Sequence, residues 1–423
     1  MIARSTAAAL MAGLCALGAP AVAAAASDYC VPQNSHYDPR DVPADGSQLQ
    51  TAPGVSRELV QVDGITTPVL SSGPRESREA VVFMHGSPGS SQDWLELQQH
   101  VGALGRRTVA WDMPGFGHAD KPWGLPLGIE PASAFAQHML ERLGIERVHL
   151  VLQDLGGATG LQWGSEHPDA LVSAVLMDAG LLGYRHHNFA QISRTPEFGE
   201  SFMLALNRQL WSQGMQEGQR ERPLPQSFID RIYDDLDRET RCLILRVYRS
   251  AEEEQIEQWG RAQADVLSRR RRPALIIWGR HDPYVPPEMA ERQREVFPGA
   301  PIHIFEESGH WPFADDPERT AALVVPFVRC LPTGERDRIR LSVRPRRLRV
   351  GRQARVRFRA TVRSQGLTRP VCDATVRFAG RKRTTNQHGA ARMTVRPRRA
   401  GRRRARARKA GLRRGGARVA VVP

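Results

Sequence analysis

The chain has 423 residues, of which 25% are charged, and a formal net charge of +15 at pH 7. This length exceeds one ordinary domain and allows a large buried core. The charge is unevenly distributed: residues 331–423 carry 30 Lys and Arg against 3 acids, net +27, whereas the other residues together carry net −12. Neither the paired Cys/His spacing of a zinc site nor a glycine-rich phosphate loop occurs, so no metal and no organic cofactor is expected.

The first 26 residues have the pattern of a secretory signal peptide. Arg4 supplies a positive start, residues 7–25 are almost entirely small or apolar, and Ala24-Ala25-Ala26 offers a cleavage site. A retained membrane anchor is the alternative, although the apolar stretch is short and rich in alanine. We therefore expect a secreted or cell-surface, extracytoplasmic bacterial protein that begins with an N-terminal extension over residues 27–56.

Export changes how the cysteines are interpreted. After removal of residues 1–26, four cysteines remain, namely Cys30, Cys242, Cys330 and Cys372. An even number in an oxidising compartment favours disulfides, and four cysteines allow three pairings. Free buried thiols are the alternative.

Residues 57–330 alternate apolar strands with helical stretches. The predicted strands are residues 59–62, 66–70, 80–84, 108–111, 148–152, 172–177, 274–278 and 302–305. Helices are expected over residues 91–102, 131–143, 158–167, 287–296 and 317–330. This alternation predicts an α/β fold with a mostly parallel eight-stranded sheet covered on both faces. Residues of about 183–270 interrupt the pattern with helical, aromatic-containing sequence, which indicates a lid inserted over the sheet.

Asp154 follows the strand at residues 148–152 and precedes two glycines and a helix. This strand–turn–helix pattern is typical of a nucleophile elbow, here with a carboxylate where serine is usual. A carboxylate displaces a leaving group from saturated carbon and leaves an ester on the enzyme. The alternative is an aspartate that caps the following helix.

Two further polar residues follow strands in the order of a catalytic triad. Asp282 comes after the strand at residues 274–278, and His310 comes after the strand at residues 302–305. The carboxyl ends of parallel strands are where open sheets place their chemistry. The order nucleophile, acid, histidine predicts Asp154, Asp282 and His310 as a triad.

A loop with the sequence His-Gly-Ser-Pro-Gly follows the strand at residues 80–84. An oxyanion hole in this arrangement needs one N–H from this loop and one from the residue after the nucleophile. The predicted donors are the backbone N–H groups of Ser87 and Leu155, and an ordinary turn is the alternative.

Residues 57–330 resemble the α/β-hydrolase superfamily, and within it the aspartate-nucleophile branch of epoxide hydrolases and haloalkane dehalogenases. The matching motifs are His85-Gly86-Ser87-Pro88, Asp112-Met113-Pro114-Gly115-Phe116-Gly117, Gln153-Asp154-Leu155-Gly156-Gly157, Gly279-Arg280-His281-Asp282 and Gly309-His310-Trp311-Pro312. The resemblance implies a small apolar substrate, an alkyl-enzyme ester on Asp154 and hydrolysis of that ester by water that His310 activates.

The two sub-branches differ in what assists the leaving group. Dehalogenases hold the halide with a Trp directly after the nucleophile, and this chain has Leu155 there. Epoxide hydrolases protonate the epoxide from lid tyrosines, and Tyr248-Arg249 resembles their lid Tyr-Arg. A packing role for Tyr248 is the alternative, and Tyr184 and Tyr233 are candidates for a second tyrosine. We expect epoxide hydrolysis, with haloalkane dehalogenation as the alternative and a non-catalytic binding protein or adhesin as a further one.

The basic tail consists of a linker at residues 331–338 and a module at residues 339–423. Apolar and basic residues alternate with period two at residues 340–343, 354–362, 374–378 and 391–395, between turns. This pattern predicts a small β-sandwich and resembles bacterial immunoglobulin-like modules. Its arginines are expected to contact anionic cell-wall polymers or lipid headgroups, and a solvated arginine face is the alternative. Nucleic acid is not expected, because of the export signal and the lack of interleaved aromatic residues.

Overall fold

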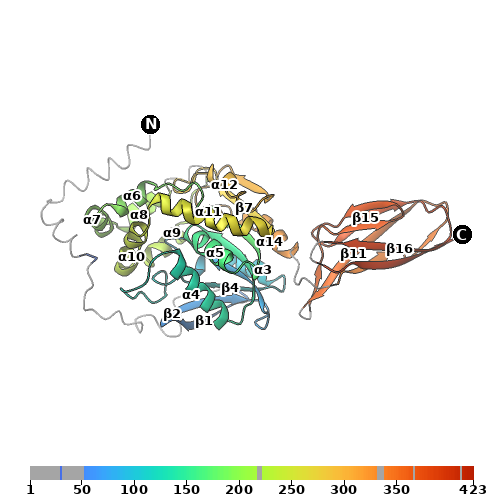
Figure 1. The fold of residues 1–423 in the computed structure, drawn as a ribbon, viewed down its shortest axis with the longest axis horizontal. Helices are drawn as coiled ribbons and strands as arrows, with labels where there is room; N and C mark the ends of the chain where they lie inside the picture. Colours follow the sequence, from blue (N-terminus) through green and yellow to red (C-terminus); the bar gives the residue numbers. More distant parts are fainter. Residues whose placement is uncertain (1–28, 31–51, 217–221, 331–337, 365–366, 410–411) are drawn as a thin grey trace. The chain divides into compact units, whose positions relative to one another are not determined.

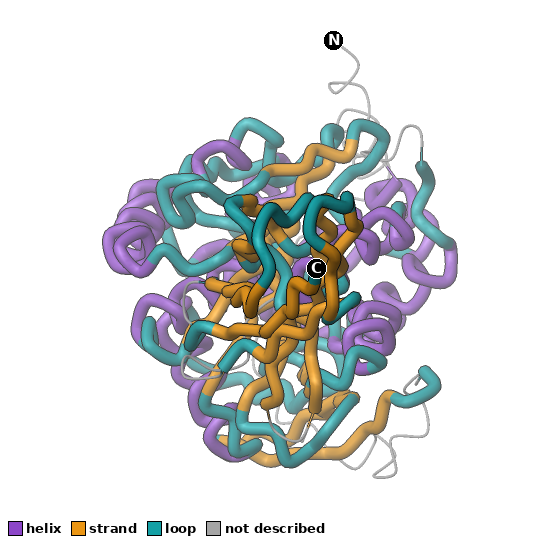
Figure 2. The backbone as a smooth tube through the Cα atoms, turned by 90° about the vertical axis from the view of Figure 1, so that its right-hand side faces the viewer, coloured by secondary structure: helices purple, strands orange, loops and turns teal. Residues whose placement is uncertain are grey.

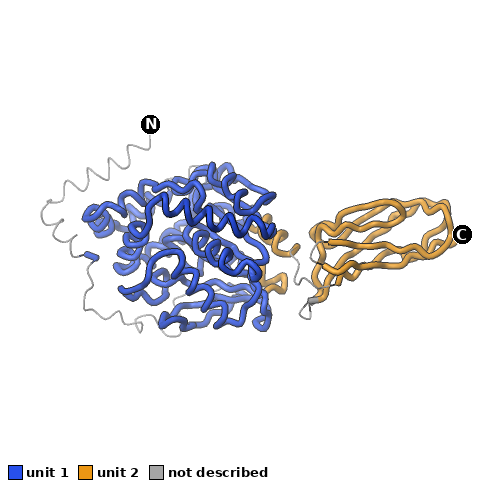
Figure 3. The backbone as a smooth tube through the Cα atoms, viewed as in Figure 1, with its two compact units in different colours: residues 1–99, 107–320 blue, residues 100–106, 321–423 orange. Residues whose placement is uncertain are grey.

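The computed structural model describes residues 29–30, 52–216, 222–330, 338–364, 367–409 and 412–423. The predicted signal peptide and residues 331–337 of the predicted linker lie outside the described residues. The chain divides into two compact units, residues 1–99 with 107–320 and residues 100–106 with 321–423 (Figure 3). The predicted domain bounds stay predictions, and each unit is described by itself.

An eight-stranded sheet forms the centre of the first unit (Figure 1). Its order is β1-β2-β4-β3-β5-β6-β7-β8; β1 and β2 are antiparallel to their neighbours, and the strands from β4 to β8 are parallel. The strands are β1 (Val55–Val62), β2 (Ile65–Ser72), β3 (Glu79–Met84), β4 (Arg107–Trp111), β5 (Arg147–Gln153), β6 (Leu171–Met177), β7 (Ala274–Gly279) and β8 (Ile302–Phe305). All eight predicted strands are therefore confirmed.

The central strands are apolar throughout because both faces of the sheet are covered. Every residue of β3, β4, β6 and β7 is buried, as expected for parallel strands between helical layers. The core combines strand residues such as Leu150 and Ile276 with Trp111, Trp163 and Trp278. The helices of this unit lie around the sheet (Figure 2).

Helices connect the strands as the sequence pattern predicts, with one correction. They include η2 (Ser91–Trp94), α3 (Leu95–Gly102), α4 (Ile129–Arg142), α5 (Leu155–Glu166), α12 (Met289–Arg292) and α13 (Pro312–Asp315). The helix predicted over residues 287–296 was wrong in extent, since only α12 is helical. Beyond it the chain continues in i→i+3 turns, in which Val296 N–H bonds to Gln293 O at 3.1 Å. Pro298 disfavours helical backbone at the residue before it, which limits extension of α12.

A helical segment lies between β6 and β7, where the lid was expected. It comprises α6 (Asn188–Arg194), α7 (Phe198–Ala205), α8 (Arg208–Gln216), α9 (Gln226–Asp234), α10 (Arg238–Arg249) and α11 (Glu253–Arg270). Helix α9 buries Ile229 and Ile232 on one face, whereas α10 buries four consecutive residues, Cys242, Leu243, Ile244 and Leu245. Consecutive residues of a helix point in different directions, so α10 is covered by the unit on most of its sides.

The C-terminal strands form two sheets that enclose one apolar core. One sheet has the order β10-β17-β16-β13-β14, and the other joins β12, β11 and β15, with β9 also paired to β11. The strands are β9 (Arg340–Arg344), β10 (Arg347–Arg349), β11 (Ala354–Ser364), β12 (Leu367–Pro370), β13 (Thr375–Phe378), β14 (Arg381–Thr384), β15 (Ala390–Val395), β16 (Gly401–Arg408) and β17 (Gly415–Val422). The all-β prediction is confirmed, whereas the immunoglobulin-like identity stays a prediction. The core contains Phe358 and Phe378, with ring centroids 5.5 Å apart.

The four cysteines Cys30, Cys242, Cys330 and Cys372 form two disulfides. Cys30 pairs with Cys242 on α10, and Cys330, the last residue of α14 (Pro317–Cys330), pairs with Cys372. This selects one of the three pairings that the sequence left open and rejects the free-thiol alternative.

Among the described residues, none of the helices is both long enough and apolar enough to cross a membrane.

Candidate active site

Asp154 occupies a sharp turn between β5 and α5. Its φ of 48° and ψ of −122° are uncommon for a residue with a side chain, and such strain persists only where the surrounding structure imposes it. The following glycines allow this turn: a Cβ on Gly156 would lie 2.4 Å from Met84 O, and one on Gly157 would lie 2.6 Å from Ala179 Cβ. Small residues at these positions therefore let α5 pack directly on the neighbouring strand ends.

The carboxylate of Asp154 faces the predicted oxyanion donors. Ser87 N–H donates to Asp154 Oδ1 at 2.9 Å, and the N–H of Leu155 acts on the same carboxylate. The side chain makes no capping hydrogen bond to α5, which disfavours the helix-cap alternative. Burial alone would raise the pKa of Asp154, but His310 and the two N–H groups outweigh it and lower that pKa. Asp154 is therefore an ionised carboxylate at neutral pH.

His310 lies between the two predicted carboxylates. Its Nε2 is 3.6 Å from Asp154 Oδ2, and its Nδ1 is 2.7 Å from Asp282 Oδ2. The other oxygen of Asp282 accepts the N–H groups of Tyr284 (2.7 Å) and Val285 (2.9 Å), which fix the acid's orientation. The structure thus brings all three predicted triad residues together.

Electrostatic contacts on His310 change its basicity in opposite directions. Burial lowers the pKa of His310, but Asp282 and Asp154 raise it well above the usual value. The Gln153 side-chain amide lies 2.9 Å from Nε2, the ring nitrogen that faces Asp154. Because one of the charges that raise the pKa is on Asp154, esterification of Asp154 would lower the pKa of His310 and favour its action as a base.

Asp178, at the end of β6, belongs to the same cluster and was missed by the sequence analysis. Its Oδ1 accepts Gly279 N–H at 2.8 Å, and its carboxyl also shares a side-chain hydrogen bond with Asp282. Burial and the neighbouring Asp282 raise the pKa of Asp178 well above its usual value and so favour its neutral form. Its signal in the sequence was an acid directly after a buried strand, the pattern that identified Asp154.

Within the described residues, one cluster of side chains could hold a metal ion. It consists of Asp178, Asp282 and His310, whose potential ligand atoms all lie within 4.8 Å of one another. The contact between His310 Nδ1 and Asp282 already uses two of these atoms for the triad.

A cavity of about 550 Å³ opens in front of Asp154 and is lined by both core and lid residues. Its wall is mainly apolar, with Trp111, Phe116, Phe135, Leu243, Val247 and Trp259. This volume and lining are typical of a site for a small apolar ligand with a few polar groups. The polar groups include Ser87, Asp154, Tyr184, His187 and Tyr248.

The predicted lid tyrosine lies in this cavity. Tyr248 Oη is 3.3 Å from His187 Nε2, and burial raises the pKa of Tyr248 well above its usual value. Tyr184 also lines the cavity, and burial and then Asp154 raise its pKa. Tyr233 does not line the cavity; its ring lies beneath the guanidinium groups of Arg208 and Arg241. Of the two candidates for a second tyrosine, Tyr184 is therefore the one near Asp154.

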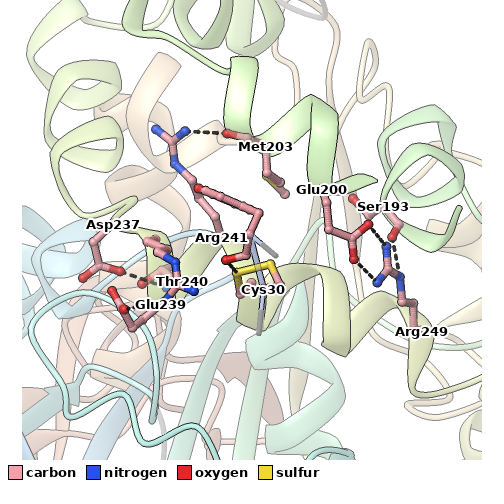
Figure 4. The surroundings of a disulfide bond; sticks show 12 residues. Cys30, Ser193, Glu200, Met203, Asp237, Glu239, Thr240, Arg241 and Arg249 are labelled. Carbon is pink, nitrogen blue, oxygen red and sulfur yellow. Dashed lines mark hydrogen bonds and ion pairs between the residues drawn. A yellow bond between two sulfur atoms is a disulfide. The ribbon is translucent and has the colours of Figure 1, made fainter. Parts of the chain in front are cut away.

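The α10 helix that carries Tyr248 is fixed at several points (Figure 4). Arg249 donates to Ser193 O (2.9 Å) and to both oxygens of Glu200 (2.6 and 2.9 Å), and the Cys30–Cys242 disulfide ties the same helix to the N-terminal extension. Bidentate contacts of this kind specify orientation as well as distance. The position of Tyr248 therefore depends on the lid's internal contacts.

The family model for the α/β hydrolase fold matches residues 79–317. A 2-hydroxy-6-oxononadienedioate/2-hydroxy-6-oxononatrienedioate hydrolase of Burkholderia vietnamiensis is 26% identical over 282 residues, covering 63% of this chain and 93% of that protein. An uncharacterized protein of Mycobacterium tuberculosis is 28% identical over 325 residues, covering 73% of this chain and 88% of that protein.

Solved structures with the same fold include haloalkane dehalogenases. DbeA from Bradyrhizobium elkani is 22% identical with a TM-score of 0.57, covering 65% of this chain and 97% of that chain. DatA from Agrobacterium tumefaciens is 22% identical with a TM-score of 0.55, covering 65% and 96%. The likeness to these structures shows the fold. The matched model covers more than half of the chain and spans the elbow, the acid and the histidine: the chain belongs to the α/β hydrolase fold family.

Proposed function

We propose that this protein hydrolyses small apolar epoxides through a covalent ester on Asp154. The observation that carries the proposal is the placement of an ionised carboxylate between two backbone N–H donors and His310, at the wall of an apolar cavity. A carboxylate held in this way can attack carbon with one oxygen while the other remains hydrogen-bonded.

In the first step, Asp154 Oδ2 forms a bond to an epoxide carbon and the ring C–O bond breaks. The opening oxygen takes a proton from Tyr248, which becomes a tyrosinate. Because the side chain of Leu155 has no N–H to stabilise an anionic leaving group, proton donation by Tyr248 favours an epoxide over a halide.

His187 supports this assignment of Tyr248. The Nδ1 of His187 accepts the N–H of Ala190 at 3.2 Å, so in the neutral ring Nε2 carries the proton. Burial lowers the pKa of His187 to about 4, and the ring is therefore neutral at pH 7. Nε2–H then donates to Tyr248 Oη, so the hydroxyl hydrogen of Tyr248 can be donated to a substrate in the cavity. The same hydrogen bond from His187 stabilises the tyrosinate after the proton has been transferred.

In the second step, water adds to Cγ of the ester and the bond between Cγ and the alkyl oxygen breaks. The departing alkoxide takes the second proton of that water and leaves as the diol, so Asp154 is again a carboxylate. His310, oriented by Asp282, takes the water proton, and the N–H groups of Ser87 and Leu155 stabilise charge on Oδ1. The proton gained by His310 balances the one given by Tyr248, so the net reaction adds one water and yields a diol.

Haloalkane dehalogenation by the same ester is the second candidate. It is supported by the indole rings of Trp111 and Trp259 in the cavity wall, which could donate to a halide. It would not need the proton of Tyr248. A panel of small epoxides and haloalkanes tests both: we expect turnover of epoxides and its loss in Asp154→Ala. Full activity of Asp154→Ala would refute the proposal, and turnover of haloalkanes alone would select the second candidate.

We also propose that the protein is exported. The disulfides Cys30–Cys242 and Cys330–Cys372 support this, since disulfides persist in oxidising compartments. Fractionation of the producing cells should recover the mature chain outside the cytoplasm, beginning near Ser27; recovery of an uncleaved chain from the cytoplasm would contradict export.

A further inference from the structure

The C-terminal module carries a column of arginines down a central strand of each sheet. On β16, Arg402, Arg404, Arg406 and Arg408 are exposed, while Ala405 and Ala407 between them are buried. On β11, the arginines at positions 355, 357 and 359 alternate in the same way with buried Val356, Phe358 and Ala360. Both strands are labelled in Figure 1. The buried residues of both strands belong to one core, so the two columns lie on opposite outer faces of the module.

Strand register extends each column into rows across the sheet. On one face Arg406 is paired with Arg377, which is paired with Lys382. On the other face Arg357 is paired with both Arg344 and Arg392. Side chains of directly paired residues lie about 5 Å apart on the same face, where like charges repel.

The module has almost no acid to offset this repulsion. Asp373 is the one acidic residue of residues 338–423. An external anion would therefore stabilise the arrangement. Along each column, alternate residues are about 6.8 Å apart, so one extended chain can meet successive guanidinium groups. Residues 338–423 contain only two lysines, and the planar guanidinium group is the one that binds phosphate with two hydrogen bonds.

The same surface lacks the groups that other anionic partners use. Phe358 and Phe378, the two residues of the module with phenyl rings, are buried, so they are not available for base stacking or insertion into lipid, and His388 is the exposed aromatic ring of the described module. Among the described side chains of these strands, the exposed large aliphatic one is Val422, near the end of the chain. These features favour a hydrophilic polymer over a membrane or a nucleic acid.

We propose that the C-terminal module binds a linear polyanion with closely spaced phosphate groups on each outer sheet face, and so bridges two polymer segments. This role is independent of the hydrolase chemistry. Binding depends on the position of the arginines in the columns and not on net charge alone, and bridging requires both columns.

The test uses the full-length protein, long-chain inorganic polyphosphate as the probe, and three triple variants that remove the same charge from different places. The β16 variant is Arg404→Gln/Arg406→Gln/Arg408→Gln, the β11 variant is Arg355→Gln/Arg357→Gln/Arg359→Gln, and the control in exposed loops is Arg398→Gln/Arg399→Gln/Arg414→Gln. Affinity and the amount bound at saturation are measured by fluorescence anisotropy and bridging by turbidity, at an ionic strength of ~0.15 M. Turnover of a small substrate and the circular dichroism spectrum check folding.

Each column variant should bind about half as much polyphosphate at saturation, because the other column still binds, and should abolish turbidity. The loop control should bind as much polyphosphate as the unmodified protein and keep its turbidity. Equal losses in all three variants would reduce the effect to net charge and overturn the proposal. Tighter binding to phosphatidylglycerol vesicles or to duplex DNA than to polyphosphate would overturn it in favour of those partners.

Discussion

Replacement of Tyr248 by Phe separates the epoxide mechanism from its alternatives. The change removes one hydroxyl and keeps the ring, which packs against His187 and Phe189 with centroids 5.6 and 5.7 Å away. The fold should therefore persist. What is lost is the proton donor for the opening epoxide.

The expected loss follows from the role of a general acid. Such a group contributes typically 10²–10⁴-fold, which corresponds to about 3–5 kcal/mol in the barrier. The loss should be in kcat of ester formation, so no ester should accumulate on Asp154. His187→Phe should cost less than Tyr248→Phe, because it removes only the donor that orients the tyrosine proton and leaves that proton in place.

The assay is single-turnover opening of a small epoxide, with an alkyl halide of similar size as the control substrate. Halide displacement needs no proton from Tyr248, so Tyr248→Phe should leave any such reaction nearly unchanged. Equal losses on both substrates, or no loss on the epoxide, would refute the reasoning and make Tyr248 a packing residue.

Three further outcomes are expected. His310→Gln should allow an ester to accumulate on Asp154, detectable by mass spectrometry of the elbow peptide; an unmodified peptide after substrate addition would contradict the base role. Reduction of Cys30–Cys242, which closes a loop with a sequence separation of 212 residues, should remove about 5 kcal/mol of stability and lower Tm; an unchanged Tm in Cys30→Ser/Cys242→Ser would refute this. Because the pKa of Asp178 is raised in the folded state, its contribution to stability is present at acidic pH and is lost as pH rises above the usual aspartate range. Asp178→Asn should therefore flatten the fall in Tm between acidic and alkaline pH, and an unaltered pH profile would show that Asp178 is ionised throughout.

Much of the first unit could be predicted because its signals are local. Most of the sheet strands are short apolar runs; Asp154 follows β5 directly, and Asp282 and His310 lie on the loops that follow β7 and β8. The chain order alone then places them at one edge of a parallel sheet. The same reasoning could have found Asp178, since it also follows a buried strand.

The missed features depend on contacts that are distant in the sequence. The tautomer of His187 follows from its contacts with Ala190 and Tyr248, which only the folded lid brings together. The disulfide pairing required the position of α10 relative to Cys30. Strand β16 was overlooked because its outward residues are all arginine, although the alternation with Ala405 and Ala407 was visible in the sequence.

Oxygen tracing in one turnover tests the central claim, the ester on Asp154, most directly. Excess enzyme is mixed with an epoxide in ¹⁸O-labelled water, and both the diol and the peptide that contains Asp154 are analysed by mass spectrometry. Because water attacks Cγ of the ester, the new diol oxygen comes from Asp154 and should be unlabelled, while the Asp154 carboxylate gains ¹⁸O. A diol labelled in the first turnover, with an unlabelled Asp154 peptide, would mean that water attacks the epoxide directly and would contradict the account.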